Sequence, residues 1–254
     1  MDTTRIRAAI AATHMTGTTT TWQLRESTTA ATEPGGRLGR HIEHDLRSLG
    51  YAVDAGLRHV EVQPRTVEWK RWSPILDQGD LGSCTGNALT GWFGCAPYVG
   101  SAADAAQYDE DFAVRLYELA TQLDHIPGEY PPDDTGSTGL AVAKAARRAD
   151  LIHAYHHVLT TLGLHRALTL QPVIVGITWY SSFDTPNADG TIHLTSDAYV
   201  RGGHEVLVRG WDGANLIADN SWGESWGDNG SFRIPSDVWQ ELRSEGADVV
   251  VPVR

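Results

Sequence analysis

The spacing of apolar residues predicts helices in the middle third of the chain. Between residues 112 and 123 apolar side chains recur every three or four positions, and Pro127-Gly128 follows, which is the pattern of an amphipathic helix and its end. Residues 88–93 have the same spacing and predict a buried helix. Residues 140–149 are rich in alanine and predict a third helix.

The final third of the chain has a strand-like pattern instead. Short apolar runs at Val173–Ile177, Glu205–Val208 and Asn215–Ala218 are separated by Gly, Asp and Asn residues that favour turns. Helices that precede strands, without alternation, are typical of an α+β protein rather than of a parallel doubly wound sheet. We therefore expect two lobes, one mostly helical and one mostly β-sheet.

Changes in this pattern divide the chain into three regions. Residues 1–36 contain eleven threonines and no sustained period, so we expect a weakly structured, Thr-rich tail. Residues 37–66 are expected to form an N-terminal extension that packs on the following domain, either across its functional site or as a buttress of the lobes. Residues 67–254 are expected to form that domain.

The composition narrows the class of protein. The 254 residues carry a formal net charge of −12, which argues against nucleic-acid and anionic-membrane partners because both need a basic face. The sequence has no apolar run near the length of about 18 residues that predicts a membrane span. Two cysteines, Cys84 and Cys95, cannot make a disulfide framework, so we expect a reducing, cytoplasmic compartment.

Cys84 is the candidate nucleophile. It follows the flexible loop Gly79–Ser83 and precedes the predicted helix at 88–93, so it is expected at or near a helix N-terminus. Free amide groups and the helix dipole at that end lower the pKa of a thiol and favour the nucleophilic thiolate. Cys95 lies in an apolar stretch and is expected in the core.

A thiol nucleophile needs a nearby base and a group that orients the base. Among eleven histidines, His204 differs because two glycines precede it and a strand-like run follows. Asn220 comes sixteen residues later, after the next strand. If these strands pair, both side chains reach one end of a sheet, where the Asn amide oxygen can accept a hydrogen bond from the imidazole.

Three blocks of sequence resemble the signatures of the papain-like cysteine proteases. They are Asp77–Cys84 (DQGDLGSC), Gly203–Val206 (GHEV) and Asn220–Gly230 (NSWGESWGDNG). Their order along the chain is that of the family. His204 and Asn220 follow Cys84 by 120 and 136 residues, close to the family spacing of about 130–150. A weaker resemblance extends from residue 67 to the C-terminus.

The resemblance implies a role for each matching residue. Cys84 is the nucleophile that forms an acyl-enzyme, His204 exchanges a proton with it and with the leaving amine, and Asn220 orients His204. Gln78, with the backbone amide of Cys84, forms the oxyanion hole. Trp222 shields the imidazole–amide hydrogen bond from water and is a candidate substrate-binding residue.

Other positions are less typical of the family. Gly136 and Ser137 align with the strip that binds the substrate main chain, an assignment that rests on their place in a loop. Leu81 replaces the family's first cysteine, which removes a disulfide, and Thr85 replaces the aromatic residue after the nucleophile. Residues 1–66 lack the long charged helix of the usual inhibitory propeptide.

The resemblance implies a two-lobed papain-like fold, with a helical N-terminal lobe, an antiparallel β-sheet or barrel in the C-terminal lobe and the active-site cleft between them. It implies a cysteine endopeptidase that hydrolyses peptide bonds in protein or peptide substrates. Two alternatives remain open. One is a thiol amidase, isopeptidase or transpeptidase that acts on cell-wall or branched peptides, and the other is a non-catalytic binding module with the same fold.

We expect no cofactor and no metal site. His153, His156 and His157 lack a Cys or carboxylate block at ligand spacing, and His41 and His44 are expected on a salt-bridged surface segment. The expected partner is a protein or peptide substrate, with no nucleic acid and no membrane, and the chain is expected to be a monomer. The absence of disulfides and of a familiar propeptide is more typical of bacterial or phage members.

Overall fold

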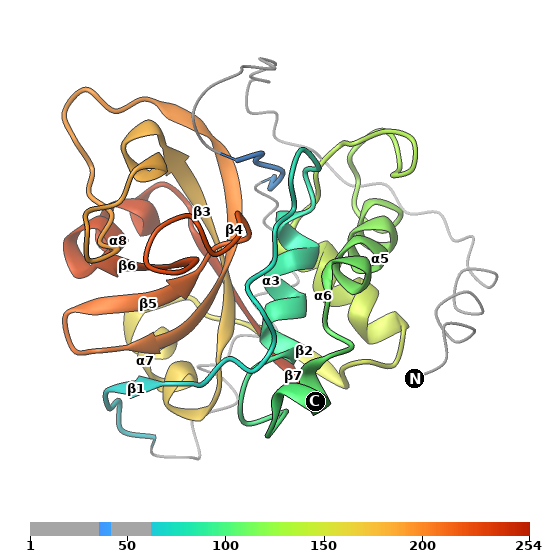
Figure 1. Cartoon of the computed structure of the whole chain (residues 1–254), viewed down its shortest axis with the longest axis horizontal. Coiled ribbons are helices and arrows are strands. Elements are labelled where there is room, and N and C mark those ends of the chain that lie inside the picture. Colours follow the sequence, from blue (N-terminus) through green and yellow to red (C-terminus); the bar gives the residue numbers. More distant parts are fainter. Residues whose placement is uncertain (1–35, 42–61) are drawn as a thin grey trace.

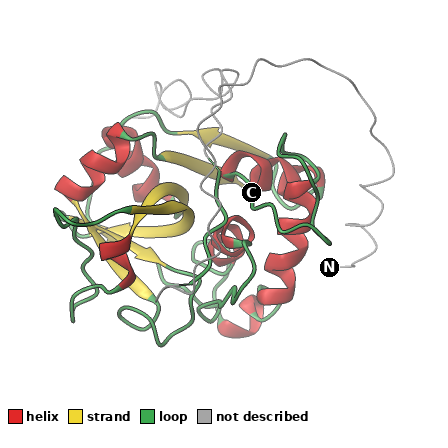
Figure 2. Ribbon diagram, turned by 90° about the horizontal axis from the view of Figure 1, so that it is seen from above, coloured by secondary structure: helices red, strands yellow, loops and turns green. Residues whose placement is uncertain are grey.

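The structure, a computed structural model, describes residues 36–41 and 62–254. One side of the molecule is helical, and the other holds an antiparallel sheet with further helices packed against it, as Figures 1 and 2 show from two directions. The expected tail therefore lies outside the described residues, except for its last glycine, and so do residues 42–61 of the expected extension. In the described ranges, none of the helices is long and apolar enough to cross a membrane.

The helical lobe follows the predicted pattern closely. It contains α3 (Cys84–Phe93), the short α4 (Ala102–Ala105), α5 (Glu110–Thr121) and α6 (Gly139–Arg148). Side chains just before three of these helices accept hydrogen bonds from amide groups of the first turn. They are Ser101 from Asp104 N–H, Asp109 from Phe112 N–H and Thr138 from Ala141 N–H. The three helices predicted from apolar spacing are confirmed.

The sheet lobe is built from antiparallel strand pairs. Its strands run in the spatial order β2-β7-β3-β4-β5-β6, and β1 pairs with β4. Because β2 and β6 are the two ends of this order among the described strands, the sheet is open rather than a closed barrel. The strands are β1 (Val67–Glu68), β2 (Ala154–His157), β3 (Val173–Tyr180), β4 (Val200–Trp211), β5 (Asn215–Asp219), β6 (Ser231–Pro235) and β7 (Asp248–Val253).

Two hydrophobic cores meet on opposite faces of β3. Val175 and Ile177 pack into the core covered by α7 (Thr161–Leu170) and α8 (Ser236–Ser244), whereas Ile174 packs into the core of the helical lobe. A short 3₁₀ helix, η3 (Ser181–Asp184), follows β3. Burial on both faces explains why residues 173–177 form a continuous apolar run rather than an alternating one. It also fixes the two lobes against each other.

An ion-pair network fixes the end of β5, directly before Asn220. Asp219 Oδ1 accepts hydrogen bonds from Arg209 Nε at 2.9 Å and from Ser231 Oγ at 2.7 Å, and its Oδ2 lies 3.3 Å from Arg71 Nη1. Arg209 also contacts Glu68 Oε1 at 2.6 Å, but the Glu68 side chain is 58% exposed. The buried carboxylate of Asp219 therefore joins three segments of the chain, whereas the exposed carboxylate of Glu68 lies at the edge of the network.

We predict that Asp219→Asn lowers the free energy of unfolding by about 3–5 kcal/mol, because two nearly buried guanidinium groups lose their shared carboxylate. Glu68→Gln is the matched control, and its expected cost is about 0–1 kcal/mol because that ion pair is exposed. Urea unfolding followed by tryptophan fluorescence measures both. Equal costs for the two variants would show that burial does not set the strength of this network.

Candidate active site

Cys84 is the first residue of α3 and is fully buried between the lobes. Ser83 precedes the helix but does not cap it with its side chain, because its hydroxyl group donates instead to Asn87 Oδ1 at 2.9 Å. The first amide groups of an α-helix have no acceptor within the helix, so the end of α3 presents N–H donors and a positive dipole beside the sulfur. This is the position that the sequence predicts for the thiol.

His204 and Asn220 come from two neighbouring strands and are both buried. His204 lies on β4, and Asn220 follows the last residue of β5, its antiparallel partner. His204 Nε2 and Asn220 Oδ1 are 2.7 Å apart, and Asn220 Oδ1 also accepts from Ser221 N–H at 2.8 Å. Nε2 therefore donates its proton to the amide oxygen. His204 Nδ1 is buried and has no hydrogen-bond partner among the described residues.

Two tryptophans enclose the imidazole of His204. The ring centroid of Trp222 lies 5.2 Å from that of His204, and the ring centroid of Trp179 lies 4.9 Å from it. Both indoles are buried, so they exclude water from the hydrogen bond between His204 and Asn220. Sequence reasoning found Trp222 but missed Trp179, because an aromatic residue near the end of a buried strand is indistinguishable from a core residue.

Gln78 is hydrogen-bonded to Ser221, the residue that follows Asn220. Its backbone N–H donates to Ser221 O at 2.9 Å, its side-chain Oε1 accepts from Ser221 Oγ at 2.6 Å, and its Nε2 donates to Leu81 O at 2.7 Å. The side-chain amide group is thus fixed in orientation, with one further N–H available for a substrate. Ser221 is a positioning residue that sequence reasoning did not identify.

Residues 36–41 cross the site between the two lobes, next to α3 and β4 (Figure 1, blue). Arg40 N–H donates to Gly203 O at 3.0 Å, His41 N–H donates to Ser137 O at 2.7 Å, and Ser137 N–H donates to Gly39 O at 2.7 Å. The segment runs parallel to the backbone at Ser137 and antiparallel to that at Gly203. Part of the expected N-terminal extension therefore lies over the predicted active site.

The predicted strip at Gly136 and Ser137 does carry main-chain hydrogen bonds in this structure, but its partner is the chain's own residues 39–41. Gly136 has a φ of +70°, and an added Cβ there would collide with Gly39 O. The positive φ and the close approach of Gly39 O both require a glycine at position 136. The position accepts an extended segment edge-on, and the assignment of Gly136 and Ser137 to substrate binding stays a prediction.

Asp134 connects the loop before Cys84 to this strip. Its carboxylate accepts hydrogen bonds from Gly82 N–H at 3.0 Å and from the Tyr117 hydroxyl at 2.6 Å, and the same hydroxyl accepts from Gly136 N–H at 2.8 Å. Arg37 of the crossing segment also pairs with Asp134, at 2.9 Å. The sequence did not predict this hydrogen-bonded cluster, because its members come from four separate parts of the chain.

The side chain of Arg40 is enclosed beside the predicted triad. It is 1% exposed and forms ion pairs with Glu205, at 3.7 Å between Nε and Oε2, and with Asp248. Neither acidic residue was predicted. The available signals were a charged residue directly after His204 in an apolar strand, and another at the start of the valine-rich run at 249–251.

Burial favours the neutral forms of the Cys84 thiol and the His204 imidazole. Desolvation raises the pKa of the Cys84 thiol to about 12, and the backbone amides of Glu205 and Gly39 oppose that shift only partly. Desolvation also lowers the pKa of His204 to about 4, against the opposing hydrogen bond to Asn220. With residues 36–41 in place, the site holds a thiol and a neutral imidazole rather than an ion pair.

The histidines considered as metal ligands do not gather into one group in the described part of the chain. His156 and His157 are on strand β2 rather than on a helix, His41 Nε2 bonds to Thr135 O at 2.7 Å, and His44 falls outside the described residues. Among the residues that the structure describes, no group of three His, Cys, Asp or Glu side chains could hold a metal ion. Both described cysteines are free and buried.

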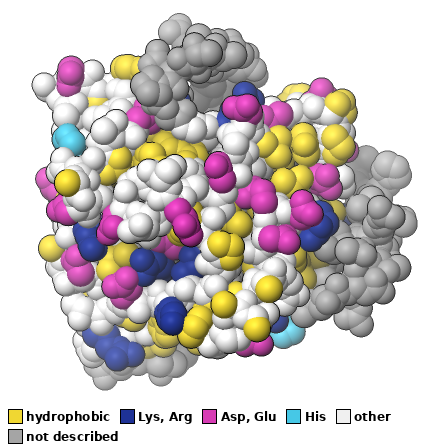
Figure 3. Space-filling view, viewed as in Figure 1, with side chains coloured by type: hydrophobic (Ala, Val, Ile, Leu, Met, Phe, Trp, Pro, Cys, Tyr) yellow, Lys and Arg dark blue, Asp and Glu magenta, His cyan; other side chains and the backbone are white. Residues whose placement is uncertain are grey.

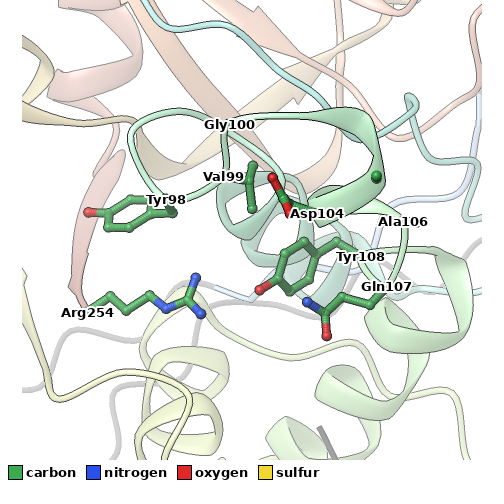
Figure 4. Close-up of a pocket in the computed structure, with 9 residues that line it drawn as sticks. Tyr98, Val99, Gly100, Asp104, Ala106, Gln107, Tyr108 and Arg254 are labelled. Atoms are coloured by element: carbon green, nitrogen blue, oxygen red, sulfur yellow. The ribbon is translucent and has the colours of Figure 1, made fainter.

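A surface hollow elsewhere on the helical lobe is separate from this site (Figure 4). It is lined by residues of the loop around Tyr98, by Asp104 and Tyr108, and by the C-terminal Arg254. None of the predicted catalytic or substrate-binding residues lines it.

Comparisons of sequence link the chain to known proteases. A family model described as papain family cysteine protease matches residues 115–247, which include His204 and Asn220 and begin after Cys84. Cathepsin B-like CP3 of Giardia intestinalis is 28% identical over 221 residues, covering 72% of this chain and 73% of that protein. Cathepsin B-like cysteine proteinase 4 of Caenorhabditis elegans is 27% identical over 167 residues, which cover 60% of this chain and 45% of that protein.

Comparisons of structure give the same fold. The crystal structure of xylellain, a cysteine protease from Xylella fastidiosa, superposes with a TM-score of 0.62 at 20% identity, covering 89% of this chain and 99% of that one. Digestive procathepsin L2 from Tenebrio molitor gives a TM-score of 0.56 at 17% identity, with 87% and 79% coverage. Since the family model matches more than half of its length, the chain belongs to the papain family of cysteine proteases.

Proposed function

We propose that this cysteine peptidase is an endopeptidase in which Cys84, His204 and Asn220 act as a catalytic triad. The observation that carries the proposal is the 2.7 Å contact between His204 Nε2 and Asn220 Oδ1, which leaves Nδ1 buried without a partner. The backbone N–H of the next residue, Glu205, faces the Cys84 sulfur. An imidazole with a fixed tautomer and an available lone pair, on the residue before the one whose N–H faces the sulfur, supports nucleophilic catalysis by the thiol.

The proposed reaction has two steps. His204 Nδ1 takes the thiol proton, the Cys84 sulfur forms a bond to the substrate carbonyl carbon, and the negative charge on the carbonyl oxygen is stabilised by Cys84 N–H and Gln78 Nε2. The C–N bond then breaks as His204 gives its proton to the leaving amine, which yields an acyl-enzyme. A water molecule that loses its proton to His204 releases the acid and restores the thiol.

Endopeptidase activity is supported by the way residues 36–41 cross the site. The segment is an interior stretch of the sequence, since residues precede it and follow it. The groove therefore accommodates the interior of an extended polypeptide, paired through its main chain with Ser137 and Gly203. We infer a protein or peptide substrate on the same grounds.

Residues 36–41 are also proposed to keep the enzyme latent. The segment leaves Cys84 without solvent access, and the pKa of the thiol, raised to about 12 by burial, disfavours the thiolate at neutral pH. Departure of the segment would restore water to both reacting groups. Their pKa values would then return toward the range in which a thiolate and an imidazolium coexist.

Replacement of the nucleophile tests the triad. We predict that Cys84→Ala lowers the hydrolysis of a diverse peptide library by roughly three orders of magnitude or more, because the acyl-enzyme cannot form. Cys95→Ala is the matched control and should retain turnover, since Cys95 packs in the core of the helical lobe. Comparable hydrolysis by the Cys84→Ala and wild-type chains would rule out the proposed mechanism.

A substitution at Gly39 tests latency. An added Cβ at Gly39 would collide with the backbone oxygen of Gly82, so Gly39→Val should displace the segment from the site. Overpacking of this kind costs about 1–3 kcal/mol, and we expect labelling of Cys84 by an epoxide thiol reagent to accelerate about five- to hundredfold. The labelled residue is identified by mass spectrometry.

Gly100→Val serves as the control, because an added Cβ at Gly100 meets no atom within 4 Å. It should label at the wild-type rate. If Gly39→Val also labels at that rate while the protein stays folded, residues 36–41 do not control access to the thiol.

A further inference from the structure

Asp184, the last residue of η3, joins side chains from strands β3 and β4. Its Oδ1 accepts a hydrogen bond from Trp179 Nε1 at 2.8 Å and another from Arg201 Nη1 at 2.7 Å. Its backbone oxygen also accepts a hydrogen bond from Trp226 Nε1, at 2.9 Å. One acidic residue therefore holds two indoles and a guanidinium group.

This ion pair is enclosed. Acidic side chains are spread over the outer face of the molecule that Figure 3 shows. The Asp184 side chain, in contrast, is only 9% exposed, and that of Arg201 is 12% exposed. Removal of one partner from a poorly solvated pair leaves the other charge without compensation, so the carboxylate and the guanidinium group depend on each other.

Trp179 connects Asp184 to the imidazole of His204. The ring centroids of Trp179 and His204 are 4.9 Å apart, with the ring planes at 74°, and the centroids of Trp179 and Trp222 are 5.0 Å apart. The indole of Trp179 is fully buried, so its N–H group needs an acceptor, and Asp184 is that acceptor. The hydrogen bond to Asp184 thus sets the orientation in which Trp179 packs against His204.

Arg201 brings a positive charge to the same imidazole. It lies on β4, three residues before His204. Burial lowers the pKa of His204 most, and the charges of Arg201 and Arg40 lower it further. The other titratable groups of the site are the Cys84 thiol on α3 and Glu205, which follows His204 directly. Arg40 belongs to the crossing segment and departs with it when the proposed latency ends, whereas Arg201 stays beside the imidazole.

We propose that Asp184 is a positioning residue for the peptidase reaction, which holds the Trp179 indole against His204 and balances the charge of Arg201 beside the imidazole. The proposal rests on the proposed function, because it concerns the imidazolium that forms when His204 takes the thiol proton. Without the carboxylate, the uncompensated guanidinium charge disfavours a proton on His204. Asp184 therefore helps the imidazolium to persist at a pH where the thiolate has formed.

The pH dependence of kcat/KM tests the charge balance, because its alkaline fall reports loss of the imidazolium proton. The full-length Gly39→Val chain and a library peptide that it hydrolyses give the reference profile. Asp184→Asn keeps an acceptor for Trp179 but removes the charge, so we expect the alkaline midpoint to move down by about 0.5–1 pH unit. Arg201→Gln removes the cation and should move the midpoint up by a similar amount. The double variant should return close to the reference.

Matched variants separate this role from a merely structural one. Asp184→Ala removes both the charge and the acceptor for Trp179, so we expect kcat at the optimum pH to fall about tenfold with little change in KM. Asp184→Asn should recover most of that kcat and keep the shifted midpoint. Asp197→Asn is the control, because it removes the same charge from a fully exposed position between η3 and β4, and it should leave the profile unchanged.

The outcomes distinguish the positioning role from the proposed function. Folded Asp184→Asn and Arg201→Gln chains that keep the reference midpoint, or whose midpoints move in the same direction, overturn the positioning role and leave the peptidase assignment standing. If the Asp184 variants do not fold, Arg201→Gln decides, since an upward shift supports the charge balance and an unchanged midpoint overturns it. If neither the wild-type nor the Gly39→Val chain hydrolyses any peptide, the proposed function fails, and the positioning role fails with it.

Discussion

A buried acidic side chain needs a proton or a positive charge beside it, and Glu205 carries this constraint next to Cys84, because burial raises its pKa well above the usual value and the Arg40 guanidinium at 3.7 Å opposes that shift. Its position is set by the sheet, since the residue before it is His204 and its cross-strand neighbour is a glycine that leaves space above the strand. Arg40 meets the requirement from a segment 165 residues earlier in the chain. The electrostatics of one buried side chain therefore couple residues 36–41 to the groove.

Enclosure links the burial of the site to its proposed latency. The same segment that neutralises Glu205 removes water from Cys84 and His204, and desolvation raises the pKa of the thiol and lowers that of the imidazole. The geometry of the His204–Asn220 pair is unaffected, because the sheet, the two tryptophans and the Asp219 network hold it from the other side. The proposed latency is thus a change in solvation, and the hydrogen bond between His204 and Asn220 is already formed.

The parts of the site that could be predicted from the sequence are those marked by the spacing of apolar residues and by turn residues close to them in the chain. Cys84 stands at a loop-to-helix junction, and His204 and Asn220 belong to consecutive strands whose pairing brings them to one end of the sheet. Arg40 and Asp248 are 208 residues apart, and their meeting depends on strand register and on the path of an irregular segment, which carry no periodic signal. Strands β2, β6 and β7 were not predicted either, and β2 and β7 pair with strands that are distant in the sequence.

The most direct test of the account is the ionisation state of Cys84, followed by the ultraviolet absorbance of the thiolate and referenced to chains that also carry Cys84→Ala. The account predicts no thiolate at neutral pH in the wild-type chain. It predicts a clear thiolate signal in Arg40→Ala, where the segment has lost its buried anchor, and none in Arg37→Ala, whose ion pair with Asp134 involves a side chain that is 44% exposed. A folded Arg40→Ala chain whose thiol titrates as in the wild type would contradict it.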